Sequence, residues 1–408
     1  MTLAHISLLG IVIAITIGFV MKVNTGLVSL AFAFVIGNIF AGIGANQIIG
    51  YWPTRLFFIL FGVTLVFSIA KENKTMEKLA RKAVYLSGGN VKVIPWIFFL
   101  LSLGLAAIGP GNISIAALLG PIAMAVASET KINPSLMAGV MICGAVAGGL
   151  SPIAPTGIIG VELAAEIGLD TGMFVWIRQI AATTIYAAIV FTILGGFKMK
   201  KSEGFVNQEK PEAFDQKQLI TLGGIALLVI AVIIGNYNIG LAAFTVATLL
   251  LLLKVAPQKT SLGGVPWGTL LLVSGTGVLI SVSSELGGLV VLTEFLSQFM
   301  TAGTAPAFIA VISGIMSFFS SASGVVMPTM IRSAPDLVAS LGGGSVPSLI
   351  AAIVIGSHLV TPSPISTMGA LLFAGATEEM DKQKIFRDLL IIAIGGVAFA
   401  AVFSLIVL

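Results

Sequence analysis

The chain has 408 residues, of which 57% are hydrophobic and only 9% are charged, and its formal net charge is +4. A soluble globular domain carries about 25% charged residues, so this composition, with a mean hydropathy of +1.09, indicates a protein that lies in a lipid bilayer. The single cysteine, Cys143, excludes a disulfide or a cysteine metal cluster within one chain.

Long apolar runs predict ten membrane spans, because a helix needs about 20 apolar residues to cross the hydrocarbon core. Proline and glycine interrupt the fourth and ninth of them, so we expect those two to be broken helices. The first run is expected to be retained, since no small-residue cleavage site is evident. The expected spans lie near 3–21, 26–46, 53–71, 134–168, 172–197, 218–235, 238–254, 266–284, 345–377 and 386–408.

Two further apolar segments, near 92–128 and 287–338, are interrupted in the middle by polar residues. The first contains Gly109-Pro110-Gly111-Asn112 and the second contains Ser320-Ser321-Ala322-Ser323-Gly324. Each piece is short for a full crossing, so we expect two re-entrant hairpins that enter and leave on one side. Non-helical backbone at that depth is stable only where protein or a water-filled cavity surrounds it.

The two halves of the chain resemble each other at a displacement of about 212 residues. Ser151-Pro152-Ile153 recurs as Ser363-Pro364-Ile365, and Gly62 recurs as Gly275. Five crossings per copy, an odd number, make the second copy upside down relative to the first. Such inverted repeats usually bind their substrate where the copies meet. We therefore expect a first repeat at 1–200, a cytoplasmic linker at 201–217 and a second repeat at 218–408.

The basic residues predict how the chain is oriented. With the N-terminus outside, 18 of the 21 Lys and Arg residues fall in inner loops, and only Arg55, Arg178 and Arg332 do not. Cytoplasmic loops carry an excess of Lys and Arg. We therefore expect a multi-pass protein of the plasma membrane, the inner membrane of a bacterium, with both termini extracytoplasmic.

Four polar breaks interrupt the apolar sequence, at 109–114, 151–157, 320–324 and 361–369, and they form two matched pairs. A broken helix releases carbonyls that coordinate a cation, while the positive end of the following half-helix attracts an anion. This combination suits a carboxylate and a sodium ion. Ordinary helix kinks are the alternative for any one break, but four breaks in two matched pairs disfavour it.

Two ionisable residues near these breaks have open roles. Arg332 either clamps a substrate carboxylate with two hydrogen bonds or, the simpler interpretation, pairs with Asp336 one turn away or reaches outward. His358 either takes up a proton near neutral pH or, more simply, is a neutral histidine held by hydrogen bonds.

Signatures of enzymes are missing from the sequence. It contains no HExxH, P-loop, GxSxG or paired-cysteine zinc pattern. We expect no enzyme and no cofactor, so uphill transport would need an ion gradient.

The motifs GPGNISIAALLGPIA, SPIAPTG, SSASGVVMPT and TPSPISTMGAL, in this order, resemble the ion transporter superfamily. The likeness is to divalent anion:sodium symporters and, more closely, to malonate/dicarboxylate carriers of the MatC type. It implies an all-helical homodimer in which a mobile transport domain moves like an elevator against a fixed scaffold. Sodium would bind between each hairpin tip and its broken span, with the substrate carboxylates between the two tips.

The family's Ser-Asn-Thr tip signature falls on Gly111-Asn112-Ile113 and on Ser323-Gly324-Val325, where only Asn112 and Ser323 match. Its Thr-Pro element falls on Ser151-Pro152 and Thr361-Pro362, whereas the internal alignment matches Ser151 to Ser363. The residues that we expect to bind substrate are Asn112, Ser114, Thr156, Ser323, Gly324, Arg332, Thr361, Pro362 and Ser363. The expected sodium ligands, through side chains or carbonyls, are Gly109, Asn112, Ser151, Pro152, Ser321, Ser323, Thr361 and Ser366.

The predicted function is import of a small dicarboxylate, such as malonate or a C4-dicarboxylate, together with sodium. A proton-coupled carrier of a monocarboxylate or another organic anion, in the same superfamily, is the nearest alternative, and an anion channel is a more distant one. The expected partners are the organic anion, the lipid bilayer and a second copy. Nucleic acid is not expected, because the basic residues lie in loops beside membrane spans.

Overall fold

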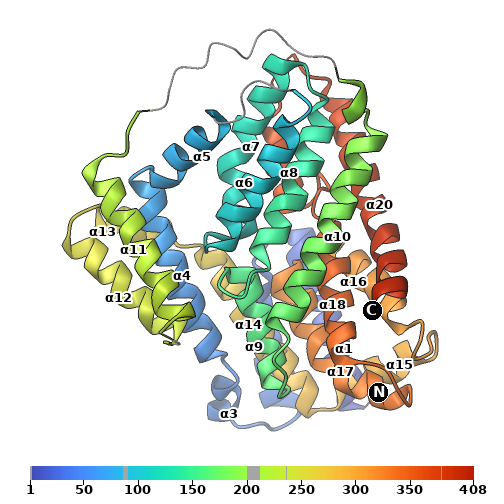
Figure 1. Cartoon of the computed structure of the whole chain (residues 1–408). Helices are drawn as coiled ribbons and strands as arrows, with labels where there is room; N and C mark the ends of the chain where they lie inside the picture. Colours follow the sequence, from blue (N-terminus) through green and yellow to red (C-terminus); the bar gives the residue numbers. More distant parts are fainter. Residues whose placement is uncertain (1, 86–90, 200–211, 236, 378) are drawn as a thin grey trace.

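The computed structural model describes residues 2–85, 91–199, 212–235, 237–377 and 379–408, and the elements in this part of the chain are helices (Figure 1). Residues 201–211 of the expected linker lie outside the described residues.

The helices of the first half follow the predicted spans, with shorter helices between them. Their bounds are α1 (Leu3–Met21), α2 (Thr25–Phe32), the π-helical η1 (Ala33–Phe40), α3 (Ala45–Gly50), α4 (Thr54–Glu72), α5 (Thr75–Tyr85), α6 (Ile94–Ala107), α7 (Gly111–Thr130), α8 (Pro134–Gly149), α9 (Pro155–Glu166), α10 (Gly172–Ile193) and the 3-10 turn η2 (Gly196–Lys198).

The second half presents its helices in a similar order. They are α11 (Gln216–Ile233), α12 (Ile239–Leu252), α13 (Gln258–Gly263), α14 (Trp267–Glu285), α15 (Gly288–Ser297), α16 (Ala305–Phe319), the π-helical η4 (Ala322–Val326), α17 (Met327–Ser340), α18 (Val346–Leu359), α19 (Thr367–Ala374) and α20 (Lys382–Val407).

Six of the described helices, α1, α4, α7, α10, α14 and α20, are long and apolar enough to cross a membrane. A seventh span results if α16 and Ala322–Ser340 are counted as one, although the chain bends by 119° between them. With 20 residues, α7 is longer than expected for one arm of a hairpin. Residues 287–338, expected as one hairpin, also contain the separate helix α15 before the bent pair begins.

The helices pack as two bundles. The first bundle consists of α1–α4 and α11–α14, in which α4 packs on α12 and α14 packs on α2. The second bundle consists of α6–α10 and α16–α20, in which α8 packs on α6, α7 and α10, and α18 packs on α16, α17 and α20. α5 and α15 each contact helices of both bundles. Helices from the two halves of the chain are therefore interleaved in each bundle.

α8 and α18 form the centre of the second bundle. Every residue of Ser135–Gly149 and of Ser348–Leu359 is buried. Helices that are apolar on all sides belong in the interior of a large protein or a membrane bundle. Because each of these helices ends at a predicted polar break, the breaks at 150–154 and 360–366 begin inside the protein.

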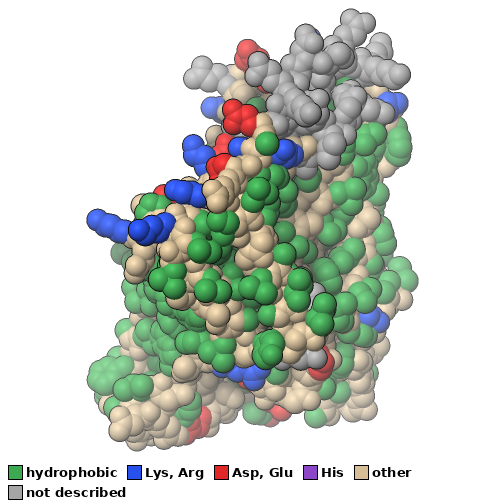
Figure 2. Space-filling model, turned by 60° about the vertical axis from the view of Figure 1, so that its left-hand side comes forward, with side chains coloured by type: hydrophobic (Ala, Val, Ile, Leu, Met, Phe, Trp, Pro, Cys, Tyr) green, Lys and Arg blue, Asp and Glu red, His purple; other side chains and the backbone are tan. Residues whose placement is uncertain are grey.

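One face of the molecule is largely apolar between two more polar ends. Figure 2 shows hydrophobic side chains over much of one face, with Lys and Arg gathered chiefly at its upper end, where α5 lies in Figure 1. α5 carries Lys78 and Lys82 and follows Lys71 and Lys74. The N- and C-termini both lie in the lower part of Figure 1, away from α5.

Candidate functional site

Residues 109–112, which the sequence predicts as the first hairpin tip, lie against residues 151–157, the break in the first predicted broken span. Asn112, at the start of α7, is 5% exposed, and its Oδ1 accepts a hydrogen bond of 3.2 Å from Oγ1 of Thr156 at the start of α9. The same oxygen accepts the backbone N–H of Ile113 at 3.0 Å. One predicted residue of the tip is therefore joined directly to one predicted residue of the broken span.

Close packing fixes the position of this tip. Gly109 and Gly111 have φ of 140° and 78°, in the region that favours glycine. A Cβ on Gly109 would lie 1.9 Å from the Phe67 ring of α4, and a Cβ on Gly149 of α8 would lie 2.7 Å from Cβ of Asn112. α4 and α8 therefore press directly on the tip.

Residues 320–324, which the sequence predicts as the second hairpin tip, are capped by Ser321 and touch the first bundle. Oγ of Ser321 accepts the N–H of Gly324 at 3.0 Å. Oγ1 of Thr276, in α14, lies 2.5 Å from the carbonyl oxygen of Gly324. Ser323 is buried beside them in η4, which also packs against α18. The second tip is thus held both by its own cap and by a helix of the other bundle.

The second broken span is closed by hydrogen bonds within itself. Oγ of Ser366 lies 2.5 Å from the carbonyl oxygen of Thr361 and 2.8 Å from that of Ser363. Oγ1 of Thr361 donates to the carbonyl of His358 at 2.7 Å. Several of the expected oxygen ligands in this segment therefore already bind other groups.

Ser151 and Ser363 occupy the same local geometry. Each hydroxyl accepts the N–H two residues on, at 3.5 Å in the first case and 3.3 Å in the second. A Cβ on Gly157 would lie 1.9 Å from the Ser151 carbonyl oxygen, and a Cβ on Gly369 would lie 2.0 Å from that of Ser363. The structural counterpart of Ser151 is therefore Ser363 rather than Thr361.

The predicted residues thus form two clusters. In the described part of the chain no hydrogen bond joins one cluster to the other; instead η4 packs against α9, and α7 packs against α19. Ser114 belongs to neither cluster, because it is exposed on α7. The first cluster is Gly109, Asn112, Ser151, Pro152 and Thr156, and the second is Ser321, Ser323, Gly324, Thr361, Pro362, Ser363 and Ser366.

Arg332 lies in α17, eight residues after Gly324, and pairs with Glu166 at the end of α9, so the expected pairing with Asp336 is not the one observed. Its Nε and Nη2 lie 2.9 and 2.8 Å from Oε2 of Glu166. Its Nη1 is buried and has no hydrogen-bond partner among the described residues. The N–H groups of Nη1 are therefore without an acceptor in the described part of the chain.

A second arginine reaches the same half-helix. Nε of Arg55, in α4, lies 2.9 Å from Oε2 of Glu162, one turn before Glu166 in α9. The Arg55 side chain is 71% exposed, whereas that of Glu162 is 12% exposed. This ion pair joins the first bundle to the second.

His358 is packed by hydrogen bonds, as the simpler interpretation predicts. It is buried, and its Nδ1 lies 2.8 Å from the carbonyl oxygen of Val354 and 3.1 Å from Oγ of Ser357. Its role in proton coupling stays a prediction.

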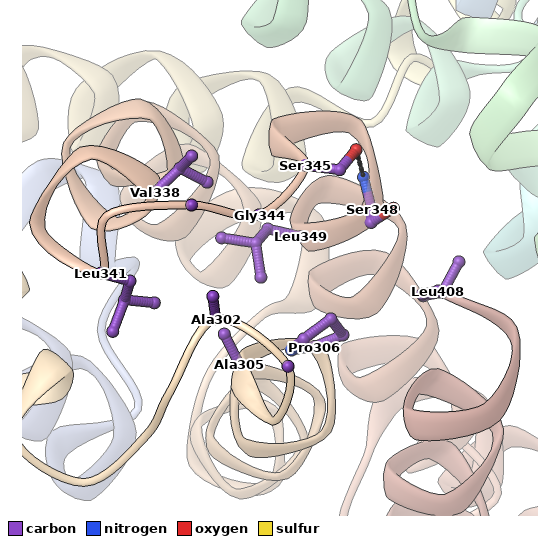
Figure 3. Close-up of a pocket in the computed structure, with 12 residues that line it drawn as sticks. Ala302, Ala305, Pro306, Val338, Leu341, Gly344, Ser345, Ser348, Leu349 and Leu408 are labelled. Carbon is purple, nitrogen blue, oxygen red and sulfur yellow. Dashed lines mark hydrogen bonds between the residues drawn. The ribbon is translucent and has the colours of Figure 1, made fainter.

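A cavity in the second bundle lies away from both clusters. It has a volume of about 250 Å³ and lies between the start of α16, the end of α17 and the start of α18 (Figure 3). None of the predicted site residues lines it. A much smaller apolar cavity, of about 10 Å³, borders the first cluster at Phe67, Ile108 and Ile153. The first cluster is therefore tightly packed in this conformation.

The first cluster has suitable groups for both an anion and a cation. The N-cap residues of α7 and α9, Pro110 and Ala154, supply no side-chain cap, and uncapped helix starts attract carboxylates. Oδ1 of Asn112 and Oγ1 of Thr156, 3.2 Å apart, are close enough to bind one cation together. These two oxygens belong to an amide and a hydroxyl group, so both are neutral ligands.

Three functional candidates were missed in the sequence. Glu162 and Glu166 could have been found from the sequence. They are two carboxylates four residues apart in an apolar half-helix, and ionisable side chains in such a segment usually have a function. Thr276 carried none, since a threonine in an apolar helix usually bonds back to its own turn. Its contact with the second tip is visible only in three dimensions.

Comparison with known proteins supports the resemblance in the N-terminal part of the chain. A search of curated proteins finds no match. The family model described as the N-terminus of the dicarboxylate carrier protein MatC matches residues 1–149, which include α1–α8 and the first hairpin tip. The first 149 residues of this chain are thus similar to the N-terminal part of a MatC-type dicarboxylate carrier, the resemblance that the motifs predict.

Proposed function

We propose that the protein is a secondary transporter that imports a small dicarboxylate with sodium by moving the second bundle against the first. The observation that carries this proposal is the hydrogen bond between Asn112 and Thr156, which joins the hairpin tip to the broken span beside two uncapped helix starts. The match to the MatC N-terminal family supports a dicarboxylate as the substrate. The first cluster would bind sodium and one carboxylate, and the second cluster would complete the substrate site.

The two halves would be inverted repeats. In support, α4 packs on α12 as α14 packs on α2, and α7 packs on α19 as α17 packs on α9. The end that carries α5 and its lysines would face the cytoplasm, in accord with the positive-inside rule, and both termini would face outward. A bacterial inner membrane and a homodimer complete the proposal.

Sodium coupling is tested by uptake into proteoliposomes. A tenfold inward sodium gradient supplies about 1.4 kcal/mol per ion, so labelled malonate or succinate should accumulate about tenfold for each coupled sodium. Equal potassium on both sides is the control. Accumulation driven only by a proton gradient would support the proton-coupled alternative and make His358 the next residue to change. Flux that equilibrates without accumulation under either gradient would support the channel.

Arg332 is expected to clamp one substrate carboxylate through its unpaired Nη1. Hydrogen bonds to charged groups are worth about 1.5–3 kcal/mol, so Arg332→Gln should raise KM for the dicarboxylate by at least about tenfold. Glu166→Gln removes the partner but keeps the guanidinium, so KM should change little. If both variants lower the thermal transition equally and neither changes KM, Arg332 only holds α17 to α9.

A further inference from the structure

The two bundles meet chiefly along α4 and α14, which correspond residue by residue. Both helices have 19 residues and follow a proline. A Cβ on Gly62 would meet Gly240 of α12, and a Cβ on Gly275 would meet Gly26 of α2. Gly62 and Gly275 therefore occupy equivalent positions, and Thr276 is the counterpart of Val63.

α4 and α14 run in opposite directions. The start of α14 lies near the end of α4, because Oγ of Ser68 donates to the carbonyl of Ser261 just before α14. The end of α14 lies near the start of α4, because Nε2 of Gln47 donates to Glu285. α5 follows the end of α4, so α5 lies at the end of the helix pair where α4 ends and α14 begins (Figure 1).

The two hairpin tips rest at displaced levels on these helices. Gly109 of the first tip packs on Phe67, four residues after Val63 in α4. Gly324 of the second tip packs on Leu272, four residues before Thr276 in α14. Because the helices are antiparallel, both displacements point toward the end that carries α5.

The contacts that α4 and α14 make with the second bundle also differ from each other. α4 packs against α9, and α14 packs against η4 and α17. The counterparts of these contacts, α14 with α19 and α4 with α7, are absent or weak among the described elements. This asymmetry is what one end state of the proposed movement would show.

Two polar contacts between the bundles support this end state. Oγ1 of Thr276 lies 2.5 Å from the Gly324 carbonyl oxygen, and Nε of Arg55 lies 2.9 Å from Glu162. The equivalent positions in the other half offer no such contact. In the other half of the chain, the residue equivalent to Thr276 is Val63. The residue equivalent to Arg55 is Gly268, and the one equivalent to Glu162 is Ala374. In the opposite end state the first tip would rest on Ile59 and Val63, and the second tip on Ile280, so those contacts would be apolar.

We propose that Thr276 and Arg55 are positioning residues that hold the second bundle in the state displaced toward α5. The inference rests on the proposed function, since it requires that the bundles move. Both residues lie outside the two clusters, so they set which end state is populated rather than what binds. Removal of either contact favours the opposite state.

Thr64 provides a matched control for Thr276. Oγ1 of Thr276 lies 2.7 Å from Leu272 O and 3.2 Å from Val273 O in its own helix. Oγ1 of Thr64 makes the same two bonds, 2.7 Å to Leu60 O and 3.2 Å to Phe61 O. Both threonines are buried. Only Thr276 also touches a hairpin tip, so a threonine-to-valine change at the two positions differs in that contact alone.

The experiment measures the populations of the two states by the distance between spin labels. The labels are placed on cysteines at the exposed positions Lys131, after α7, and Lys259, in α13, in the full chain with Cys143→Ala and reconstituted in liposomes. Thr276→Val should lower the ratio of the present state to the opposite one by about 3- to 10-fold, the effect of one hydrogen bond. Thr64→Val and Thr276→Ser should leave the ratio unchanged.

The ion pair is tested in the same way. Arg55→Gln should lower the ratio by about 2- to 5-fold, a smaller effect because an exposed pair is screened by water. The double exchange Arg55→Glu with Glu162→Arg should restore it. Equal shifts for Thr276→Val and Thr64→Val, or no rescue by the exchange, would overturn the inference while leaving the transport function intact. A single distance in all variants, with and without sodium and malonate, would overturn both.

Discussion

Replacement of Asn112 by alanine is expected to lower the initial rate of dicarboxylate uptake by at least about tenfold, because one buried oxygen with two hydrogen bonds is lost. Oδ1 of Asn112 joins the first tip to Thr156 and caps the N–H of Ile113. Alanine keeps the Cβ against which Gly149 packs, so the helices stay in contact. Initial rates in proteoliposomes with equal amounts of folded protein measure the effect.

Two further variants make this result specific. Thr130→Ala removes a buried hydroxyl that bonds Val126 O at the far end of the same helix, and it should transport at the normal rate. Asn112→Asp keeps an oxygen but adds negative charge, so sodium should bind more tightly and the dicarboxylate more weakly. Uptake by Asn112→Ala at the rate of the unsubstituted protein would remove the first cluster from the site.

Leucine in place of Gly356 or Gly144 is expected to destabilise the second bundle by about 3 kcal/mol or more, the upper range for overpacking a core. A Cβ at Gly356 would lie 2.1 Å from the Ala310 carbonyl oxygen, and one at Gly144 would lie 2.2 Å from that of Phe99. These are backbone atoms, so α18 must move away from α16, and α8 from α6. Small residues at such crossings let membrane helices approach closely. Thermal unfolding in detergent measures the loss.

Gly104 supplies the control for this prediction. It lies in α6, where a Cβ would meet no atom within 4 Å. Gly104→Leu should therefore leave the thermal transition unchanged or raise it slightly, since glycine is about 1 kcal/mol less favourable than a good helix former. A fall in stability for Gly104→Leu as large as that for Gly356→Leu would mean that side-chain volume in lipid, not the helix crossing, decides stability.

The sequence predicts the helix breaks well and the short surface helices poorly. Prolines and glycines end helices by local chemistry, so the breaks after α6, α8, α16 and α18 fall where the residues place them. α5 was missed because it is amphipathic and charged, with Lys78 and Lys82 in a segment that reads as a loop between apolar runs. Hydropathy detects only helices that face lipid or a core on most sides.

The residues of the candidate site are a prediction from the sequence, whereas the contacts between them are visible only in the structure. Asn112 and Thr156 were both expected, and their 3.2 Å contact follows from the folding of α7 against α9. The pairing of Arg332 with Glu166 was not foreseen, because Asp336 is nearer in sequence and Glu166 lies in the other half. Local spacing favours a partner one turn away, but the packing of α17 on α9 brings a distant one closer.

The interleaving of the first bundle has a consequence for how the chain is made. α2 packs on α14, and the start of α2 lies so close to α14 that a Cβ on Gly26 would meet the carbonyl oxygen of Leu271 at 2.1 Å. Chains are synthesised from the N-terminus at about 5–20 residues per second. About 240 residues separate α2 from α14, so α14 is made on the order of 10–50 s after α2. During that interval α1–α10 are in the membrane without α11–α14, and in a chain that stops before α14, α2 packs only on α1 and η1. The first bundle is therefore complete only after α14, in the second half of the chain, has been made.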